Sequence, residues 1–332
     1  MLEINLDAEL WEILITLQLA EISTNLGEHG KTKELAISIE QMILKTDEGQ
    51  LKRKPLAMLN ARFNLGILFS SLGQMDKAYF WHKKTVKMCN KIFGMNVAHH
   101  ITASCFRELA RITFLHSDYN TAVWYADLSL KMIQNVHIGN YHPDVVKSLN
   151  VLFDIHWEQD DNELAMQIAE EALELSLKTS GMNKTNLAQV YTNLGKISSD
   201  TGSHSKAIRC LEEALRIDRE LYQNKPSGNT AVSLEGLGIS YWKARNYEMA
   251  MKYVQEALHM QENLYGKDTP RPNTAESLRI LGYIKKDMGD HAEAVQYLEK
   301  SLSMMKLVFG GRVTDRMIDT IQTLQELGWM PK

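Results

Sequence analysis

The chain has 332 residues, of which 44% are hydrophobic and 23% are charged, and its formal net charge at pH 7 is −4. This slightly acidic balance argues against a nucleic-acid-binding protein, and no apolar stretch approaches the roughly 20 residues of a membrane-spanning helix. The three cysteines are odd in number and far apart, which argues against a disulfide framework or a zinc site and favours reduced thiols in the cytoplasm (Cys89, Cys105 and Cys210).

The N-terminal segment predicts a helical hairpin. A first helix is expected from about residue 7 to 25, a turn around Gly27 to Gly30, and a second helix to about residue 46. The apolar run from Leu10 to Ala20 contains Glu12 and has no basic flank, so we interpret it as a helix face and not as a signal peptide. This hairpin is degenerate, as is typical of an end repeat that has one side facing water.

A repeated pattern fills the rest of the chain and is clearest in residues 186–222. There the pair Leu194-Gly195 lies in a first helix, Gly202 lies in a turn, and Ala207 lies in a second helix. The pattern recurs every 42–44 residues, and a period of this size indicates stacked supersecondary units and not one compact core. The alanine recurs at steps of 44, 43, 42, 43 and 44 residues, at Ala78, Ala122, Ala165, Ala207, Ala250 and Ala294.

Two features of the repeat have a physical reason. A small residue before each turn allows two helices to approach closely (Gly66, Ala110, Gly195, Gly238 and Gly282). The turn needs a left-handed residue, which Gly and Asp accept most easily (Gly73, Asp160, Gly202 and Gly289). Ser117 and Arg245 occupy the same position and suit it poorly, so we expect those two turns to be tilted or longer.

Length alone would suggest two domains, but the repeat predicts one elongated solenoid over residues 7–328. The expected repeats cover residues 7–47, 56–94, 100–139, 143–181, 186–224, 229–266 and 273–310, and a capping helix follows over residues 314–328.

The order of a Leu-Gly pair, a turn residue, an alanine and an Ala-Leu pair resembles the tetratricopeptide repeat, whose usual period is about 34 residues. The longer period and the aromatic-Gly endings at 93–94, 265–266 and 309–310 resemble the kinesin light chain type of this repeat. The resemblance implies an all-α solenoid, a right-handed superhelix of seven helical hairpins and a C-terminal capping helix. It also implies that the first helices line a concave groove that contacts a ligand.

In the second to fifth repeats, the resemblance places polar and basic residues on the groove, against only Glu108 and Asp154 as acidic ones. Asn can hydrogen-bond a peptide backbone, Lys and Arg can pair with an acidic side chain or a terminal carboxylate, and a tryptophan offers a flat apolar wall. The alternative is a solvated inner face with its tryptophans packed between helices. The predicted peptide-binding groove consists of Asn60, Asn64, Arg107, Arg111, Lys147, Asn150, Trp157, Asn193 and Lys196.

No catalytic or metal-binding constellation stands out. His142 precedes Pro143 at a junction and is expected to cap a helix, and His156 is expected at an inner helix position. We therefore expect no enzymatic activity, no cofactor and no metal site. An enzyme that depends on His142 or His156 is the least favoured alternative.

These observations predict a non-enzymatic scaffold or adaptor that binds an extended peptide or a partner's helix, with acidic ligands matching the basic groove residues. Neither nucleic acid nor membrane insertion is expected, and self-association is left open. The second hypothesis is a regulatory or sensor module of a larger signalling system that changes shape when a ligand binds.

Overall fold

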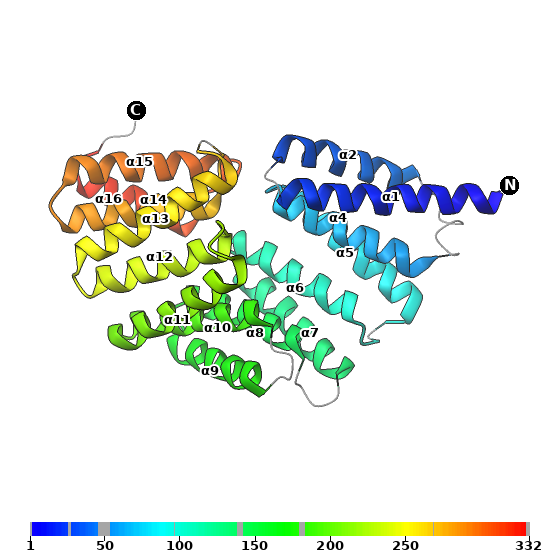
Figure 1. The fold of residues 1–332 in the computed structure, drawn as a ribbon, viewed down its shortest axis with the longest axis horizontal. Helices are drawn as coiled ribbons and strands as arrows, with labels where there is room; N and C mark the ends of the chain where they lie inside the picture. The colour runs from blue at the N-terminus through cyan, green and yellow to red at the C-terminus, as the bar shows by residue number, and fades with distance from the viewer. Residues whose placement is uncertain are drawn as a thin grey trace. The chain divides into compact units, whose positions relative to one another are not determined.

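The computed structural model describes residues 2–25, 28–45, 54–95, 97–137, 142–178, 183–267 and 269–329. The secondary structure in these ranges consists of helices joined by short connections (Figure 1). They form seven hairpins and one final helix, which confirms the predicted all-α repeat fold. The hairpins are α1 (Leu2–Asn25) with α2 (His29–Lys45), α4 (Pro55–Ser71) with α5 (Met75–Phe93), α6 (His100–Leu115) with α7 (Tyr119–Val136), α8 (Pro143–Glu158) with α9 (Asn162–Lys178), α10 (Lys184–Asp200) with α11 (His204–Tyr222), α12 (Gly228–Lys243) with α13 (Tyr247–Tyr265), and α14 (Pro272–Asp287) with α15 (His291–Val308); the final helix is α16 (Asp315–Glu326).

The chain divides into two compact units. The N-terminal unit is Met1–Asn140, with helices α1 to α7, and the C-terminal unit is Tyr141–Lys332, with helices α8 to α16. Helix α1 begins at Leu2, earlier than the start expected near residue 7. That residues 7–328 form one uninterrupted solenoid stays a prediction.

The two helices of a hairpin meet at one crowded position. A Cβ atom on Gly282 would lie 2.6 Å from Leu298 Cγ, and one on Gly66 would lie 2.6 Å from the His82 ring. Each partner lies sixteen residues after its glycine, on the second helix. The small residue is therefore required for close approach, as predicted. The same relation joins Gly195 to Leu211 and Gly238 to Val254.

Two further hairpins carry a different pair of residues at these positions. Phe153 takes the place of the glycine, and the residue sixteen positions later is Ala169; in the other hairpin Ala110 is matched with Ala126. All four side chains are buried. At Phe153 and Ala169 a large residue on the first helix is accompanied by a small one on the second, which keeps the seam densely filled. At Ala110 and Ala126 both residues are small.

The turns inside the hairpins share one geometry. From α4 onward, three residues separate the first helix of each hairpin from the second. The middle residue has a positive φ, also where it is Ser117 (59°) or Arg245 (59°). The expectation that these two turns are tilted or longer is therefore wrong. The N–H of Asn246 donates to the carbonyl of Tyr241 at 2.9 Å, and such bonds hold the turn although a side chain is disfavoured there.

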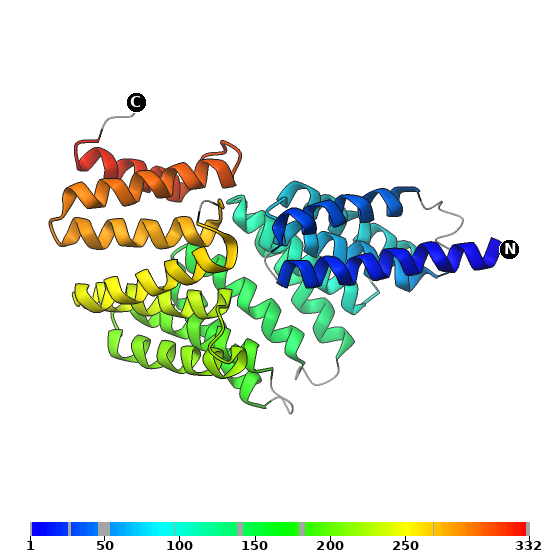
Figure 2. The same ribbon diagram turned by 45° about the horizontal axis from the view of Figure 1, so that its top comes forward.

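Stacking of successive hairpins buries the remaining apolar side chains. In the C-terminal unit, Leu211 and Leu215 on α11 pack with Leu234 and Leu237 on α12 of the next hairpin. Figure 2 shows the hairpins of this unit following one another in sequence order. Because a lone hairpin cannot bury this surface, the stack provides the core.

The close approach at Gly238 predicts a destabilised variant. Gly238→Ala places a methyl group against Val254 and 3.2 Å from the Ala250 carbonyl oxygen, and we expect the free energy of unfolding to fall by about 1–3 kcal/mol. The matched control is Gly30→Ala in α2, where no atom lies within 4 Å of the added Cβ. Alanine should stabilise that helix by up to about 1 kcal/mol. Urea unfolding measures both changes, and equal effects of the two substitutions would contradict the packing argument.

At the left-handed turn residue Arg245, a glycine should stabilise the protein, which is the opposite of the effect expected for Gly238→Ala. Arg245→Gly removes a side chain from a residue with a φ of 59° and should raise the free energy of unfolding by about 1 kcal/mol. Gly202→Ala, at the equivalent position with a φ of 78°, should lower it by about the same amount. A less stable Arg245→Gly protein in thermal unfolding would show that backbone strain does not dominate at this turn.

Candidate functional site

In the N-terminal unit, the predicted groove residues come from the first helices α4 and α6. Asn60 and Asn64 are exposed on α4. On α6, the Glu108 carboxylate lies 3.6 Å from Arg107 Nε and 3.6 Å from Arg111 Nη1. This carboxylate offsets part of the positive charge that we predicted for the groove at Arg107 and Arg111.

The same charged residues act on a buried histidine. His82 on α5 is fully buried, and its ring occupies the space next to Gly66. Burial lowers the pKa of His82 to about 4; Arg107 acts in the same direction and Glu108 opposes it. The ring is therefore neutral near pH 7 and contributes by packing.

In the C-terminal unit, predicted groove residues of neighbouring first helices contact each other. Asn193 on α10 donates Nδ2–H to Asn150 Oδ1 on α8 at 3.1 Å and accepts from Gln189 Nε2 at 3.0 Å. Lys147 instead pairs with Asp144 in its own helix, with Nζ 2.8 Å from Oδ1. A row of amides thus joins α8 to α10. Asn193 is buried within it, and the partly exposed Asn150 and Gln189 carry the donors and acceptors that a peptide backbone needs.

Trp157 is packed between first helices. Its indole N–H donates to Asp200 on α10, and Lys196 Nζ lies 4.9 Å from the ring centroid. Trp242 repeats the arrangement two hairpins later and donates to Asp287 at 2.7 Å. The tryptophans therefore tie successive first helices together, as in the alternative interpretation of the sequence.

The row of first helices in the C-terminal unit curls inward. Arg316, at the start of α16, donates Nε–H and Nη2–H to the two carboxylate oxygens of Glu158, at the end of α8, at 2.9 and 2.6 Å. Helices α10, α12 and α14 come between them in the stack. Because neighbouring helix axes lie about 8–10 Å apart, a flat row would separate α8 from α16 by roughly 40 Å. Contact across the row therefore requires a concave surface.

We call this concave surface the first-helix face. Its members come from α8, α10, α14 and α16. Tyr283 on α14 is included because its hydroxyl donates to Asp319 on α16 at 2.5 Å, and Lys147 is included because it precedes Asn150 by three residues on α8. The members are Lys147, Asn150, Trp157, Glu158, Asn193, Lys196, Glu276, Arg279, Tyr283, Arg316 and Asp319.

Charged groups gather where α14 and α16 meet this face. Glu276 pairs with Arg279 at 2.6 Å and with Arg316 at 3.5 Å, and Arg279 also reaches Asp319 at 3.1 Å. Burial opposes ionisation of Glu276, but the two arginines outweigh it and lower the pKa of this carboxyl to about 2. The cluster is therefore ionised at physiological pH, and the charge of the face is mixed.

Several members of the first-helix face were not among the residues predicted from the sequence. Arg279 occupies the same repeat position as Asn150, and Glu276 the same position as Lys147. The repeat register could therefore have identified both. The contact between Arg316 and Glu158 spans 158 residues, and no local pattern signals it.

A buried carboxyl connects two hairpins of this unit. Glu235 on α12 accepts hydrogen bonds from Gln261 Nε2 on α13 at 3.0 Å and from Ser277 Oγ on α14. Burial raises the pKa of Glu235 to about 7, although the two hydrogen bonds act in the opposite direction. The group is thus partly protonated near neutral pH.

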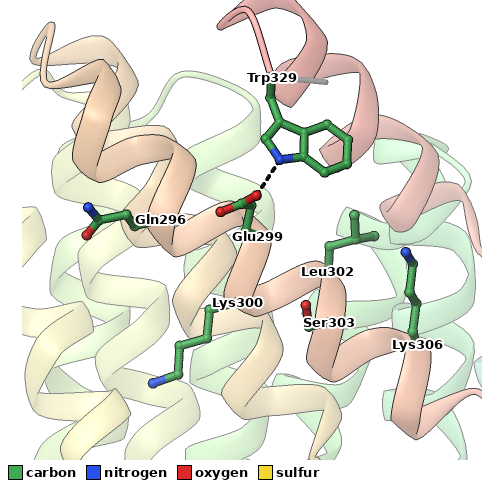
Figure 3. Close-up of a pocket in the computed structure, with 7 residues that line it drawn as sticks. All are labelled: Gln296, Glu299, Lys300, Leu302, Ser303, Lys306 and Trp329. Atoms are coloured by element: carbon green, nitrogen blue, oxygen red, sulfur yellow. Dashed lines mark hydrogen bonds between the residues drawn. The ribbon is translucent and has the colours of Figure 1, made fainter. Parts of the chain in front are cut away.

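A hollow of about 420 Å³ lies along the second helix α15. Figure 3 shows Trp329 over this helix, with its indole N–H donating to Glu299. Lys300 and Lys306 also line the hollow. Because it lies along a second helix, we do not assign it to the first-helix face.

The two histidines considered as catalytic candidates are engaged at helix ends. His142 Nδ1 accepts the backbone N–H of Asp144 at 3.2 Å and caps α8, as predicted. His156 Nδ1 lies 3.6 Å from Asp161 in the following turn. In the part of the chain that the structure describes, no group of three or more His, Cys, Asp or Glu residues is placed to hold a metal ion. Within the same ranges, no helix combines the length and the apolar character needed to cross a membrane.

The sequence profile of the tetratricopeptide repeat family matches residues 144–220, 186–263 and 229–306. These overlapping matches run from the start of α8 into α15. The chain is a tetratricopeptide repeat protein. Its repeats have the period of 42–44 residues seen in the spacing of the alanines.

Relatives of this tetratricopeptide repeat protein match it in part or at low identity. A clustered mitochondria protein homolog of Coccidioides immitis is 25% identical over 163 residues, which are 49% of this chain and 12% of that protein. The crystal structure of NprR in complex with its cognate peptide NprX has a TM-score of 0.63 at 12% identity and covers 95% of this chain and 87% of NprR. A Rap protein complexed with Competence and Sporulation Factor has a TM-score of 0.56 at 13% identity and covers 96% of this chain and 98% of the Rap chain. At these identities the structural likeness concerns the fold.

The raised pKa of Glu235 predicts a pH-dependent stability. Folding raises this pKa from its ordinary value of 4.5 to about 7. The contribution of Glu235 to the free energy of unfolding is therefore complete below pH 4.5 and is lost as the pH rises through 7. Glu235→Gln, which resembles the protonated form, should therefore be about 2 kcal/mol more stable than the native protein at pH 8 and nearly equal to it at pH 5. Urea unfolding at both pH values checks this, and a stability difference that is independent of pH would contradict it.

Proposed function

We propose that this protein is a non-enzymatic adaptor that binds an extended segment of a partner protein along the first-helix face of the C-terminal unit. The observation that supports the proposal most is the inward curl of the first helices from α8 to α16, marked by the contact between Glu158 and Arg316. A concave row of helices lined with amides and charges offers an extended chain contacts along its whole length.

The polar groups of this face suit the chemistry of a peptide. The partly exposed amides of Asn150 and Gln189 can exchange hydrogen bonds with a backbone, and the buried Asn193 between them fixes their positions. Lys147 and Lys196 provide positive charge for an acidic side chain or a terminal carboxylate. Because Glu158 and Glu276 lie on the same face, a ligand that carries both signs of charge fits it better than a purely acidic one.

We assign the exposed Asn60 and Asn64, with Arg107 and Arg111, to a second contact region in the N-terminal unit. They have the same amide and guanidinium chemistry at equivalent repeat positions. We also propose that the hairpins of residues 7–328 form one solenoid, and that the protein works in the cytoplasm.

The similar solved structures support an interaction role. NprR was solved with its cognate peptide NprX, and the Rap protein was solved with Competence and Sporulation Factor. Both share this fold over most of the chain, so a ligand-binding role is consistent with what the fold does in those two proteins.

The test uses a peptide selected from a random displayed library for binding to the full chain. Lys196→Glu reverses a charge on the first-helix face. We expect it to weaken binding about tenfold or more, because hydrogen bonds to charged groups contribute about 1.5–3 kcal/mol. Isothermal titration calorimetry gives the Kd, and circular dichroism confirms that the variant is folded.

The matched control is Lys206→Glu on the second helix α11. Lys206 is exposed and lies 4.0 Å from Glu170, so the same charge reversal is made away from the first-helix face. Its Kd should equal that of the native protein. Equal losses for the two variants, or a loss for Lys206→Glu alone, would contradict the proposed binding surface.

A sensor module that changes shape on ligand binding is the second candidate. The ion pair between Arg316 and Glu158 favours it, because a partly exposed pair between helices far apart in sequence can open without loss of the hairpins.

A further inference from the structure

One contact in the C-terminal unit departs from the rule that solenoid helices contact their neighbours in sequence. Arg316 and Glu158 are 158 residues apart, and the first helices α10, α12 and α14 separate their own helices in the stack. The two oxygens of Glu158 accept from Nε and Nη2 of Arg316 at 2.9 and 2.6 Å. This forked geometry is the strongest arrangement for a guanidinium and a carboxylate.

Each member of this pair lies at the helix end that disfavours its charge. Glu158 is the last residue of α8, where the helix dipole places partial negative charge, and Arg316 is the second residue of α16, where the dipole is positive. Neither residue stabilises its own helix there. Their long-range contact offsets both local conflicts, and such conflicts between local and tertiary preference are typical of functional positions.

The pair is also accessible to exchange. The Arg316 side chain is 40% exposed and that of Glu158 is 20% exposed, so water and a ligand can reach both. Exposed ion pairs contribute modest net stability and a forked pair contributes more, so this pair can favour the curled state and still be replaced by a ligand. Arg316 Nη1 would stay 3.5 Å from Glu276 if Glu158 left, and Arg279 would stay paired with Glu276 and Asp319. Opening the pair therefore frees the Nε–H and Nη2–H donors of Arg316 and leaves the other ion pairs of the cluster in place.

We infer that the ion pair between Arg316 and Glu158 is a latch that holds the C-terminal unit curled, and that a carboxylate of a bound peptide replaces Glu158 on Arg316 as the unit opens. The inference rests on the proposed function, because it takes the first-helix face as the surface that receives the peptide. It adds the regulation of that face and names the group on the ligand that acts on it.

The latch is tested first without ligand, in the full chain. Spin labels at the exposed residues Gln159 and Gln322, with Cys210→Ser to remove the partly exposed thiol, report the distance between the end of α8 and the second half of α16 by pulsed electron paramagnetic resonance. Glu158→Gln should shift the distance distribution to longer values. High salt should shift the native protein in the same direction, because a partly exposed pair is screened.

The matched control for the latch is Glu326→Gln. It removes the 2.6 Å ion pair with Lys286, which joins α14 to α16, and should leave the distance distribution unchanged. Distances that stay the same both in Glu158→Gln and in high salt overturn the latch. So does a shift of equal size in Glu326→Gln.

The exchange is tested with an oligoglutamate peptide, with oligoglutamine as its neutral counterpart. Glu158→Gln should bind oligoglutamate about tenfold more tightly than the native protein, because no internal carboxylate competes and more of the protein is binding-competent. Arg316→Gln should lose this binding. Equal oligoglutamate affinity of Arg316→Gln and the native protein overturns the exchange.

The two proposals fail in different ways. If the selected peptide binds through Lys196 but the labels do not move in Glu158→Gln, the latch is wrong and the proposed function stands. If the labels move and oligoglutamate binding follows Arg316 while no selected peptide depends on Lys196, the latch stands and the proposed contact along α8 and α10 is wrong.

Discussion

The spacing of the two helices in a hairpin depends on one position, where a glycine on the first helix lies against a side chain sixteen residues later. At Gly282 and Gly66 an added Cβ would come within 2.6 Å of that side chain. In the four hairpins that have this glycine, the contact sets how closely the two helices approach. In the C-terminal unit the stacked hairpins bring Arg316 on α16 back to Glu158 on α8, so this stack curves.

Curvature turns a row of ordinary helix surfaces into a candidate site. The inner positions of α8 and α10 carry amides that already hydrogen-bond across the helices, as Asn193 does to Asn150. Arg316 reaches Glu158 only because the row curls far enough to bring α16 to α8. The chemistry of the face is therefore a property of the tertiary curvature as much as of any single helix.

Local features of the fold could be predicted from the sequence, and long-range ones could not. The repeat register placed the helices and the small residues correctly, because each depends on neighbours within one hairpin. The turn at Arg245 was predicted wrongly, since hydrogen bonds across the turn outweigh the side-chain preference that the prediction used. The packing of Trp157 on α10 was left as one of two alternatives, because its partner Asp200 belongs to the next repeat. Arg316 was missed because its partner lies four hairpins away.

The most direct measurement of the central claim is photocrosslinking from the two helices of one hairpin. A photoreactive amino acid replaces either Lys147 on the first helix α8 or the exposed Glu171 on the second helix α9, and each protein is irradiated with the selected peptide. A partner that lies along the first-helix face should crosslink strongly at position 147 and weakly at position 171. Equal crosslinking at both positions, or crosslinking at position 171 alone, would contradict the account.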